Sequence, residues 1–253
     1  MAKSSLIGKI AEMQNLQEFE ELSWEGTFEQ YLKVAKENPK ACRSSFQRLY
    51  DMIISYGWEE TTELKKKIIH YNFFDDPRHG GTDAIFGLDV ALMKFVHVLK
   101  AAAFRYGPEK RILLLHGPVG SSKSTIVRLL KKGLEDYTRT PEGAVYTVEW
   151  HMPDEEVIPC PIHEEPLHII PVDWRGEALA DLNLNEAEYP IVINKELCPV
   201  CRYNYRTLLQ HYNGDWGKMI KHVKVKRFAF SEHDRVGVGT FQPKDEKNQD
   251  STE

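Results

Sequence analysis

The sequence predicts an α/β fold in which helices pack on a parallel sheet, preceded by an N-terminal helical region. Ile112 to Leu115 form an apolar run that is too short for a buried helix and is typical of a central strand in a parallel sheet. From Ile126 to Leu134, apolar residues recur at the spacing of one helix face. The order of strand, glycine- and serine-rich turn, and helix indicates one repeating unit of such a sheet.

The turn between these two segments has the composition of a phosphate-binding loop, or P-loop. It follows the pattern G-x-x-x-x-G-K-[ST] except at the second glycine position, where Ser122 stands. Backbone N–H groups of such a turn, and of the helix that follows it, point toward phosphates at the positive end of the helix dipole. The candidate binding residues are Gly117, Pro118, Val119, Gly120, Ser121, Ser122, Lys123, Ser124 and Thr125.

Two side chains of this loop have expected roles in binding ATP and Mg²⁺. Lys123 would reach the β- and γ-phosphates, and the Ser124 hydroxyl would be a ligand of Mg²⁺. At Ser122, a positive φ would cost about 1 kcal/mol, whereas another backbone conformation would leave only an extra hydroxyl. The alternative is a strand-to-helix turn that binds nothing. The coincidence of strand, loop and helix favours a P-loop NTPase domain.

The composition fits a protein with a sizeable core. The chain has 253 residues, of which 42% are hydrophobic, enough for one large domain or two small ones. A net charge of −5 gives no general attraction to nucleic acid or anionic membranes. No apolar run approaches the roughly 20 residues of a membrane-spanning helix, and the N-terminus lacks signal-peptide features. We therefore expect a cytoplasmic protein whose four cysteines are reduced and serve metal binding or packing.

Helix signals dominate the first part of the chain. Thr27 and Gln30 form a capping-box pattern before an apolar helix face. Asn38, which a proline follows, ends that helix and begins a second one. Residues 72–82 then contain proline and two glycines, which is typical of a loop. We place an N-terminal helical region at residues 1–80.

The P-loop domain is expected at residues 81–243, with an insert at residues 151–211 and a disordered tail at residues 244–253. The insert begins with a proline-punctuated irregular stretch, and such long loops are usually functional or held in place by something. The expected helices outside the P-loop unit are Leu88–Ala103, Gly176–Asn183 and Cys198–His211. The expected strands are Ala144–Trp150, Lys221–Phe230 and Arg235–Phe241.

Several long motifs resemble one family, the PrkA proteins, which are bacterial proteins classed as serine protein kinases with an AAA+-type ATPase domain. The motifs are YLKVAKENPKACRSSFQRLYDMI, HGPVGSSKST, CPIHEEPLHIIP, CPVCRY and VGVGTFQPKDEKNQD, so the resemblance covers nearly the whole chain. It implies an AAA+-like P-loop domain in which Ile85, Phe86 and Gly87 lie beside the adenine ring of ATP. By the same analogy, a homo-oligomer is expected, and a protein substrate would be handled by a region beyond this chain.

The sequence departs from that family by ending before its later parts. A search for an apolar strand ending in Asp-Glu finds only His168 to Asp173, where Pro171 interrupts the pattern, and no kinase catalytic loop is found. The catalytic residues are therefore unknown. Two readings stay open: an ATP-binding N-terminal portion of a PrkA-like kinase and ATPase, or an inactive regulatory or scaffold fragment that binds nucleotide or a partner without turnover.

A second candidate site consists of two closely spaced ligand pairs. Cys160 and His163 form one pair, and Cys198 and Cys201 form the other. Three thiolates and one imidazole make a tetrahedral Zn²⁺ set that would be structural. The alternatives are a redox pair at the second motif, or thiols that only pack in the core.

A basic cluster near the C-terminus raises nucleic-acid binding as a further alternative. Its members are Lys221, Lys224, Lys226 and Arg227. The cluster has no interleaved aromatic residues on the same face, which favours an exposed strand face. We therefore expect neither a nucleic-acid partner nor a membrane partner.

Overall fold

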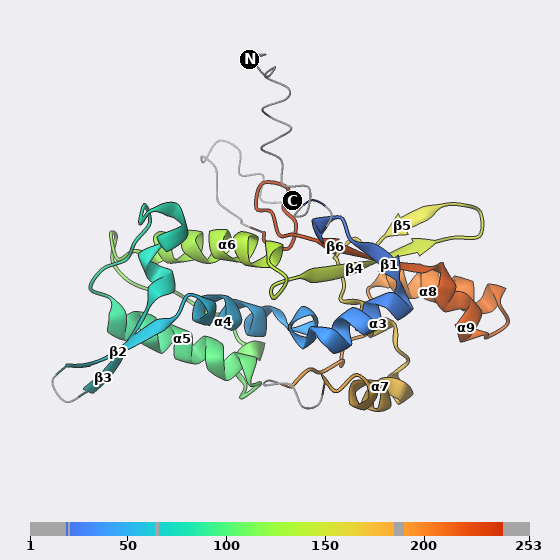
Figure 1. Ribbon diagram of the computed structural model, residues 1–253, viewed down its shortest axis with the longest axis horizontal. Coiled ribbons are helices and arrows are strands. Elements are labelled where there is room, and N and C mark those ends of the chain that lie inside the picture. Colours follow the sequence, from blue (N-terminus) through green and yellow to red (C-terminus); the bar gives the residue numbers. More distant parts are fainter. Residues whose placement is uncertain (1–18, 20, 64–65, 185–189, 240–253) are drawn as a thin grey trace, which may run out of the picture.

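The computed structural model describes residues 19, 21–63, 66–184 and 190–239, and these fold into two halves that lie end to end (Figure 1). The helices are α3 (Phe28–Glu37), α4 (Ser45–Ser55), α5 (Asp89–Ala103), α6 (Lys123–Arg139), α7 (Arg175–Asp181), α8 (Pro199–His211) and α9 (Trp216–Met219). The strands are β1 (Glu25–Thr27), β2 (Trp58–Glu63), β3 (Lys66–Tyr71), β4 (Val145–His151), β5 (Val157–Pro159) and β6 (Val223–Phe228). The predicted tail at residues 244–253 lies outside the described residues.

One half is built on a four-stranded antiparallel sheet with the strand order β1-β6-β4-β5. Strand β6 alternates in burial and turns Val223 and Val225 into the core, and Val225 lies opposite Val148 of β4. Trp150 of β4 is fully buried in the same core, together with side chains of α3 and α8. The sheet therefore joins the beginning, the middle and the end of the described chain.

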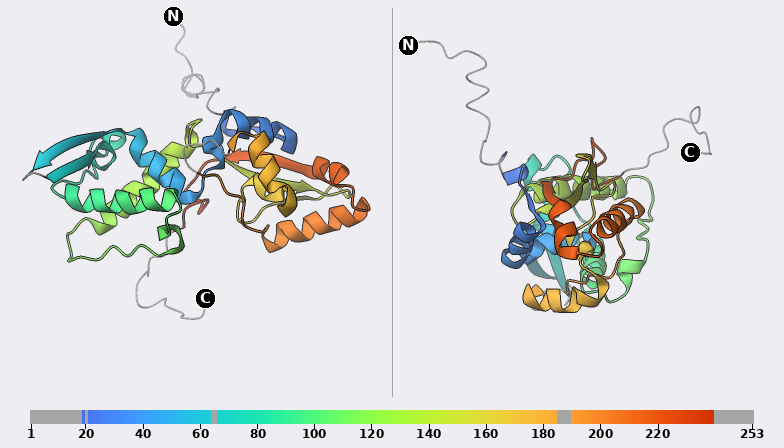
Figure 2. Two further views of the ribbon diagram at one scale, coloured as in Figure 1. Left: turned by 90° about the horizontal axis from the view of Figure 1, so that it is seen from below. Right: turned by 90° about the vertical axis from the view of Figure 1, so that its right-hand side faces the viewer.

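The other half is helical. Helix α4 packs against α5 and α6, and α5 also contacts β3 of the two-stranded hairpin. Their shared core includes Met52, Ile53, Val96, Leu99 and Leu129, which are almost completely buried. In the two views that have the long axis across the page, the β2–β3 hairpin and helix α9 lie at opposite ends of the molecule (Figure 1; Figure 2, left).

The two hydrophobic cores both cross the predicted boundary at residue 80. Phe28 and Tyr31 of α3 belong to the core of the sheet half, whereas Met52 of α4 packs with helices α5 and α6. The N-terminal helices thus divide between the two halves. The division into residues 1–80 and 81–243 stays a prediction about domains.

The prediction of a parallel sheet is wrong, because the described strands pair antiparallel. Ile112–Leu115, predicted as its central strand, has no strand structure, and Ile112 and Leu114 are 96% and 84% exposed. A buried parallel strand needs hydrogen-bonded neighbours and helices on both faces. Strands β1, β4, β5 and β6 pair with one another and leave this segment outside their sheet.

The N-terminal helices follow their capping signals closely. Thr27 accepts a hydrogen bond from the Gln30 backbone at 3.2 Å, and the Gln30 side chain accepts from the Thr27 backbone at 2.7 Å, which confirms the predicted capping box of α3. The predicted second helix is divided instead into a 3-10 turn, Pro39–Cys42, and helix α4. Ser44 begins α4 with a capping box of its own, because Gln47 stands three residues later.

The expectations for the remaining elements have mixed outcomes. The helices predicted at 88–103, 176–183 and 198–211 are confirmed as α5, α7 and α8, and the strand at 144–150 is confirmed as β4. Of the predicted C-terminal strand pair, β6 forms, but residues 235–239 contribute only an isolated bridge between Ser231 and Val236. The β2–β3 hairpin was not predicted, although it is rich in threonine and isoleucine, which favour strands.

Candidate nucleotide-binding loop and cysteine cluster

The segment predicted to be a P-loop, Gly117–Thr125, which we call the P-loop below, ends in the first turn of helix α6, whose first residue is Lys123. Gly120 has a φ of 83°, and Ser122 has a φ of 56° and a ψ of 14°, in the left-handed region. The serine thus occupies the backbone conformation for which glycine is the default residue. Of the two possibilities open for Ser122, the structure has the positive φ.

The Lys123 side chain folds back over the loop. Its ammonium group donates to the carbonyl oxygens of Gly117 at 2.9 Å and Pro118 at 2.6 Å, and to the Ser121 hydroxyl at 2.9 Å. The turn is tight at Gly117, because a Cβ atom there would come within 2.8 Å of the Ser121 hydroxyl oxygen. The loop therefore gathers a cation and several oxygen acceptors at the N-terminus of α6.

The first turn of α6 leaves backbone donors for an anion. The first four N–H groups of a helix have no hydrogen-bond partner within the helix. In α6 the Ile126 N–H bonds to the Ser122 carbonyl oxygen at 2.9 Å, and the helix has no side-chain cap. The N–H groups of Lys123, Ser124 and Thr125 thus lie at the positive end of the helix dipole without a capping side chain.

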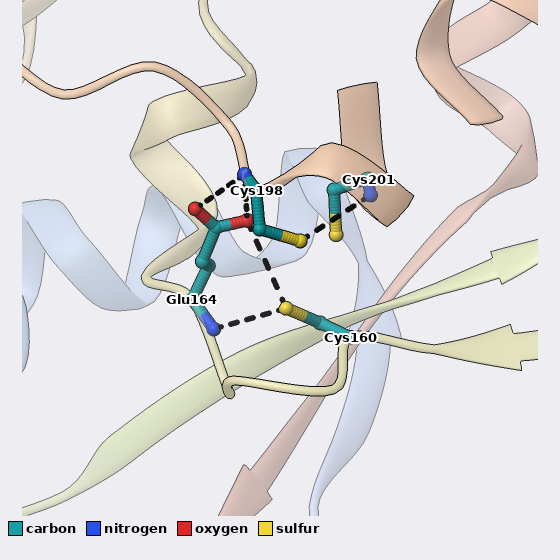
Figure 3. A group of neighbouring side chains, drawn as sticks. All are labelled: Cys160, Glu164, Cys198 and Cys201. Atoms are coloured by element: carbon teal, nitrogen blue, oxygen red, sulfur yellow. Dashed lines mark hydrogen bonds between the residues drawn. The ribbon is translucent and has the colours of Figure 1, made fainter. Parts of the chain in front are cut away.

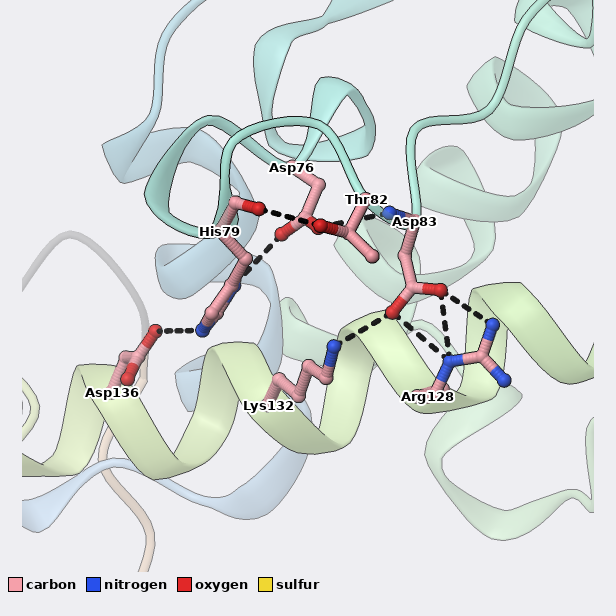
Figure 4. Close-up of polar contacts among 7 residues, drawn as sticks. All are labelled: Asp76, His79, Thr82, Asp83, Arg128, Lys132 and Asp136. Carbon is pink, nitrogen blue, oxygen red and sulfur yellow. Dashed lines mark hydrogen bonds and ion pairs between the residues drawn. The ribbon is translucent and has the colours of Figure 1, made fainter.

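The segment that holds Ile85, Phe86 and Gly87 is tied to α6 by Asp83 (Figure 4). Asp83 accepts from Arg128 Nε at 3.0 Å and from Lys132 Nζ at 2.7 Å. These hydrogen bonds to two cations hold the pKa of Asp83 well below its usual range. Although Asp83 was not singled out from the sequence, Arg128 and Lys132 stand four residues apart on one helix face, which is a recognisable cation pair.

The residues just before Asp83 form further polar contacts, both with one another and with α6. Asp76 accepts from the Asp83 backbone at 3.0 Å and contacts His79 Nδ1 at 2.8 Å, while His79 Nε2 lies 3.6 Å from Asp136 of α6 (Figure 4). Beyond it, Ile85 is buried in the core with Ile126 and Leu129, whereas Phe86 is 82% exposed. An exposed aromatic ring is thereby held on the same packed unit as the helix that begins at the P-loop.

The cysteine cluster lies in the other half of the molecule (Figure 3). One ligand atom each from Cys160, Glu164, Cys198 and Cys201 lies within 4.8 Å of the others. The three cysteines are 1%, 7% and 0% exposed and are free thiols. Cys160 follows strand β5, and Cys198 is the N-cap residue of α8. Of the predicted zinc residues, the three cysteines come together, and Glu164 joins them where His163 was expected.

Hydrogen bonds to sulfur shape this cluster. The Glu164 N–H donates to Cys160 Sγ at 3.3 Å, and the Cys201 N–H donates to Cys198 Sγ at 3.4 Å (Figure 3). The Trp150 indole N–H donates to Cys201 Sγ at 3.3 Å. A hydrogen bond from the Cys201 thiol lowers the pKa of Cys160 to about 6, and the same bond and burial raise the pKa of Cys201.

His163 lies apart from the ligand atoms of the cluster. Its ring stacks on Phe228 with the ring centres 4.8 Å apart, and its Nδ1 atom is buried without a hydrogen-bond partner. Burial lowers the pKa of His163. The sequence motif pointed to the histidine because imidazole is the commoner zinc ligand, but the neighbouring glutamate in His163-Glu164 is the residue whose carboxylate reaches Cys198.

Two other predicted features have clear positions. Residues 166–169 and 172–174, which include most of the His168 to Asp173 segment, form 3-10 turns, and Asp173 is exposed. In the basic cluster, Lys226 pairs with Glu149 at 2.8 Å, and Arg227 is buried and donates to the Arg139 carbonyl oxygen at 2.8 Å. Two of its four cations are therefore paired with other groups of the protein.

The mixed helix-and-sheet architecture is consistent with an AAA-type domain, and the comparison with known families identifies that family. The PrkA AAA domain family matches residues 26–253, so the chain belongs to that family. It is 42% identical over 235 residues to the ATP-dependent protease PrkA of Bacillus subtilis (strain 168), which covers 92% of this chain and 32% of the relative. The chain thus spans about a third of the length of that relative.

A second relative is shorter. An uncharacterized protein in the gldA 5′ region of Geobacillus stearothermophilus is 40% identical over 94 residues, which cover 37% of this chain and 86% of that protein. No solved structure matches the chain. The Bacillus subtilis relative is named a protease, so its name does not support the serine kinase activity that the resemblance implied. No helix of the described residues is long and apolar enough to cross a membrane.

Proposed function

We propose that this chain is the ATP-binding part of a PrkA-type AAA protein and that its P-loop holds the phosphates. The observation that carries the proposal is the backbone at the start of α6, where two residues with positive φ, Gly120 and Ser122, precede Lys123. Left-handed backbone residues just before a helix N-terminus can form a concave site lined by N–H groups, and such sites bind phosphate. Family membership supports nucleotide use by the domain.

The residues of the loop fit a nucleotide phosphate chemically. Phosphate oxygens would replace the Gly117 and Pro118 carbonyls as acceptors for the Lys123 ammonium group, giving charge-assisted hydrogen bonds. Ser124, in the first turn of α6, is the proposed Mg²⁺ ligand, and Mg²⁺ would neutralise part of the phosphate charge when bound. Ile85, Phe86 and Gly87 are the proposed adenine contacts, with Phe86 exposed for stacking.

Titration with a fluorescent ATP analogue tests this proposal. Lys123→Ala should weaken binding by about 10- to 150-fold, because a hydrogen bond to a charged group contributes about 1.5–3 kcal/mol. The matched control is Lys100→Ala, which removes the same charge from an exposed position on α5. Equal affinities for the wild-type protein and both variants would show that the loop is a turn that binds no nucleotide.

A second candidate function is binding of nucleotide without turnover, as a regulatory or scaffold unit. Asp173 lies exposed in a 3-10 turn, whereas a carboxylate that orients water for hydrolysis is expected beside the phosphates at the end of a strand. We expect negligible phosphate release by the chain alone. Release above background that Lys123→Ala abolishes would contradict this candidate and reveal an unrecognised catalytic acid.

The activity of a longer PrkA-type protein is a separate matter, because the chain spans a third of the Bacillus subtilis relative. We propose that ATP binding here serves work on a protein substrate, as the relative's name, an ATP-dependent protease, suggests. Self-association is proposed by analogy with the AAA domains to whose family the chain belongs. Sedimentation with and without ATP would test the assembly.

A further inference from the structure

We propose that Cys160, Glu164, Cys198 and Cys201 form a structural zinc site that fastens the irregular segment between β4 and α7 to the start of helix α8. The site is independent of nucleotide binding and lies in the core of the sheet half. Thiolate and carboxylate are both zinc ligands, and the set differs from the Cys₃His set of closed structural sites only in its fourth ligand.

The spacing of the ligand atoms fits a tetrahedral ion. Zinc–sulfur bonds of about 2.3 Å in a tetrahedron place the sulfur atoms about 3.8 Å apart. The four ligand atoms lie within 4.8 Å of one another, and Cys160 Sγ is 3.8 Å from a Glu164 carboxylate oxygen. Only small side-chain movements toward a common centre are therefore needed.

Glu164 is already oriented by the protein. Its carboxylate accepts from the Cys198 N–H, at 2.8 Å to one oxygen and 2.9 Å to the other (Figure 3). A carboxylate has about four lone-pair sites, so it can keep a hydrogen bond while one oxygen binds a metal. The same backbone N–H thus fixes the position of a ligand that comes from the other segment.

The groups around the cluster would also stabilise the net charge of a zinc-bound site. Three thiolates and one carboxylate carry four negative charges, and zinc carries two positive ones, which leaves a net charge of −2. The N–H groups of Glu164 and Cys201 and the Trp150 indole donate to the sulfur atoms. The N-terminus of α8, where Cys198 is the cap residue, adds a positive dipole end.

The segment that the metal would hold has little regular structure of its own. Between β4 and α7 the chain forms only the three-residue strand β5 and two 3-10 turns. Cys160 lies within this segment, and Cys198 lies well beyond it in sequence, so a shared ion would join two segments that few backbone hydrogen bonds connect. A metal can supply the cohesion that regular structure does not.

Metal analysis of the full chain, purified without a histidine tag, tests the site. The wild-type protein should contain about one zinc per chain, and Cys160→Ser and Cys201→Ser should contain almost none. Cobalt(II) added to the metal-free wild type should give thiolate-to-cobalt charge-transfer absorption. Because the cobalt spectrum is measured on the wild type, it decides the question even where a cysteine variant fails to fold. A wild-type protein that holds no zinc and takes up neither metal would overturn the proposal, as would a disulfide between two of these cysteines.

The identity of the fourth ligand is tested by a matched pair of neighbours. Glu164→Gln should weaken zinc affinity, measured by competition with a chelator, by at least about tenfold, whereas His163→Ala should leave it unchanged. His168→Ala is a second control, because that imidazole also has a buried Nδ1 without a partner. Loss of zinc in His163→Ala with full affinity in Glu164→Gln would overturn the assignment of Glu164.

Discussion

The P-loop and the cysteine cluster differ in the range of the contacts that build them. In the P-loop, Lys123 bonds to residues two to six positions away, and the backbone bends at Gly120 and Ser122 immediately before α6. In the cluster, Cys160 and Glu164 come from the irregular segment between β4 and α7, whereas Cys198 and Cys201 lie at the start of α8. The three cysteines are buried in a core shared with the sheet.

The surroundings of the two sites differ as well. The residues that lead into the P-loop are exposed, with Ile112 at 96% and Leu114 at 84%, whereas the cluster is enclosed by side chains such as Trp150 and Leu208. Among the described residues, no strand pairs with the segment that leads into the P-loop. The P-loop is thus a local structure on the end of a helix, and the cluster is a product of tertiary packing.

The largest expected effect is that removal of the metal disturbs the surroundings of the cysteine cluster and leaves those of the P-loop intact. Structural zinc contributes on the order of 10 kcal/mol of apparent binding free energy, so chelation should unfold the insert around Cys160 and loosen the start of α8. Helices α5 and α6, which share a different core, should keep their amide protection. Hydrogen exchange with and without a chelator measures this. Uniform loss of protection across both halves would show that the two cores are not separable in this way.

The next prediction compares two leucines. Leu208 is fully buried in α8, so Leu208→Ala should lower the free energy of unfolding by about 2–5 kcal/mol. Leu114 is 84% exposed, so Leu114→Ala should change it by no more than about 0.5 kcal/mol. Urea denaturation of the two variants makes the measurement. A large loss in Leu114→Ala would mean that the segment before the P-loop is packed in solution, which would break the comparison.

Smaller effects are expected at the two residues of the P-loop with positive φ. Ser122→Gly should stabilise the protein by about 1 kcal/mol, because glycine adopts this backbone conformation without strain. Gly120→Ala should destabilise it by about 1–2 kcal/mol, because a residue with a Cβ atom is strained at this positive φ. No other atom lies within 4 Å of the added methyl group, so backbone strain is the main expected effect. Thermal unfolding of both variants tests the pair. Equal melting temperatures would contradict positive φ at these positions.

The smallest effect is a pH dependence at Asp83. Hydrogen bonds from Arg128 and Lys132 keep the pKa of Asp83 below its unfolded value, so the ion pairs stabilise the protein at neutral pH. Their contribution should decrease as the pH falls from about 4, where the carboxylate of the unfolded chain takes up a proton, toward the lower pKa of Asp83 in the folded protein. Asp83→Asn should therefore melt earlier than wild type at pH 7, with a difference that narrows in acid. A difference that stays constant with pH would exclude the carboxylate charge as its cause.

The sequence alone determined the features that depend on near neighbours. The capping box at Thr27, the helix bounds of α5 and α8, and the turn before Lys123 all follow from residues a few positions apart. The second capping box, at Ser44, has the same kind of local signal, although the proline at position 39 favours an earlier helix start. Short-range hydrogen bonds and backbone preferences act before any tertiary contact, so their signals are local.

Tertiary structure alone decided which segments meet. The apolar run Ile112–Leu115 has the composition of a buried strand, but periodicity reports a preference for burial and not the identity of a partner strand. The short strand β1 pairs with β6, which lies near the end of the described chain, and β6 pairs with β4; both pairings are antiparallel. Tertiary structure also decides why Glu164, and not His163, lies with the three cysteines. Both residues fit the spacing of the motif, and only the turn after Cys160, which stacks the imidazole on Phe228 and directs the carboxylate to Cys198, selects between them.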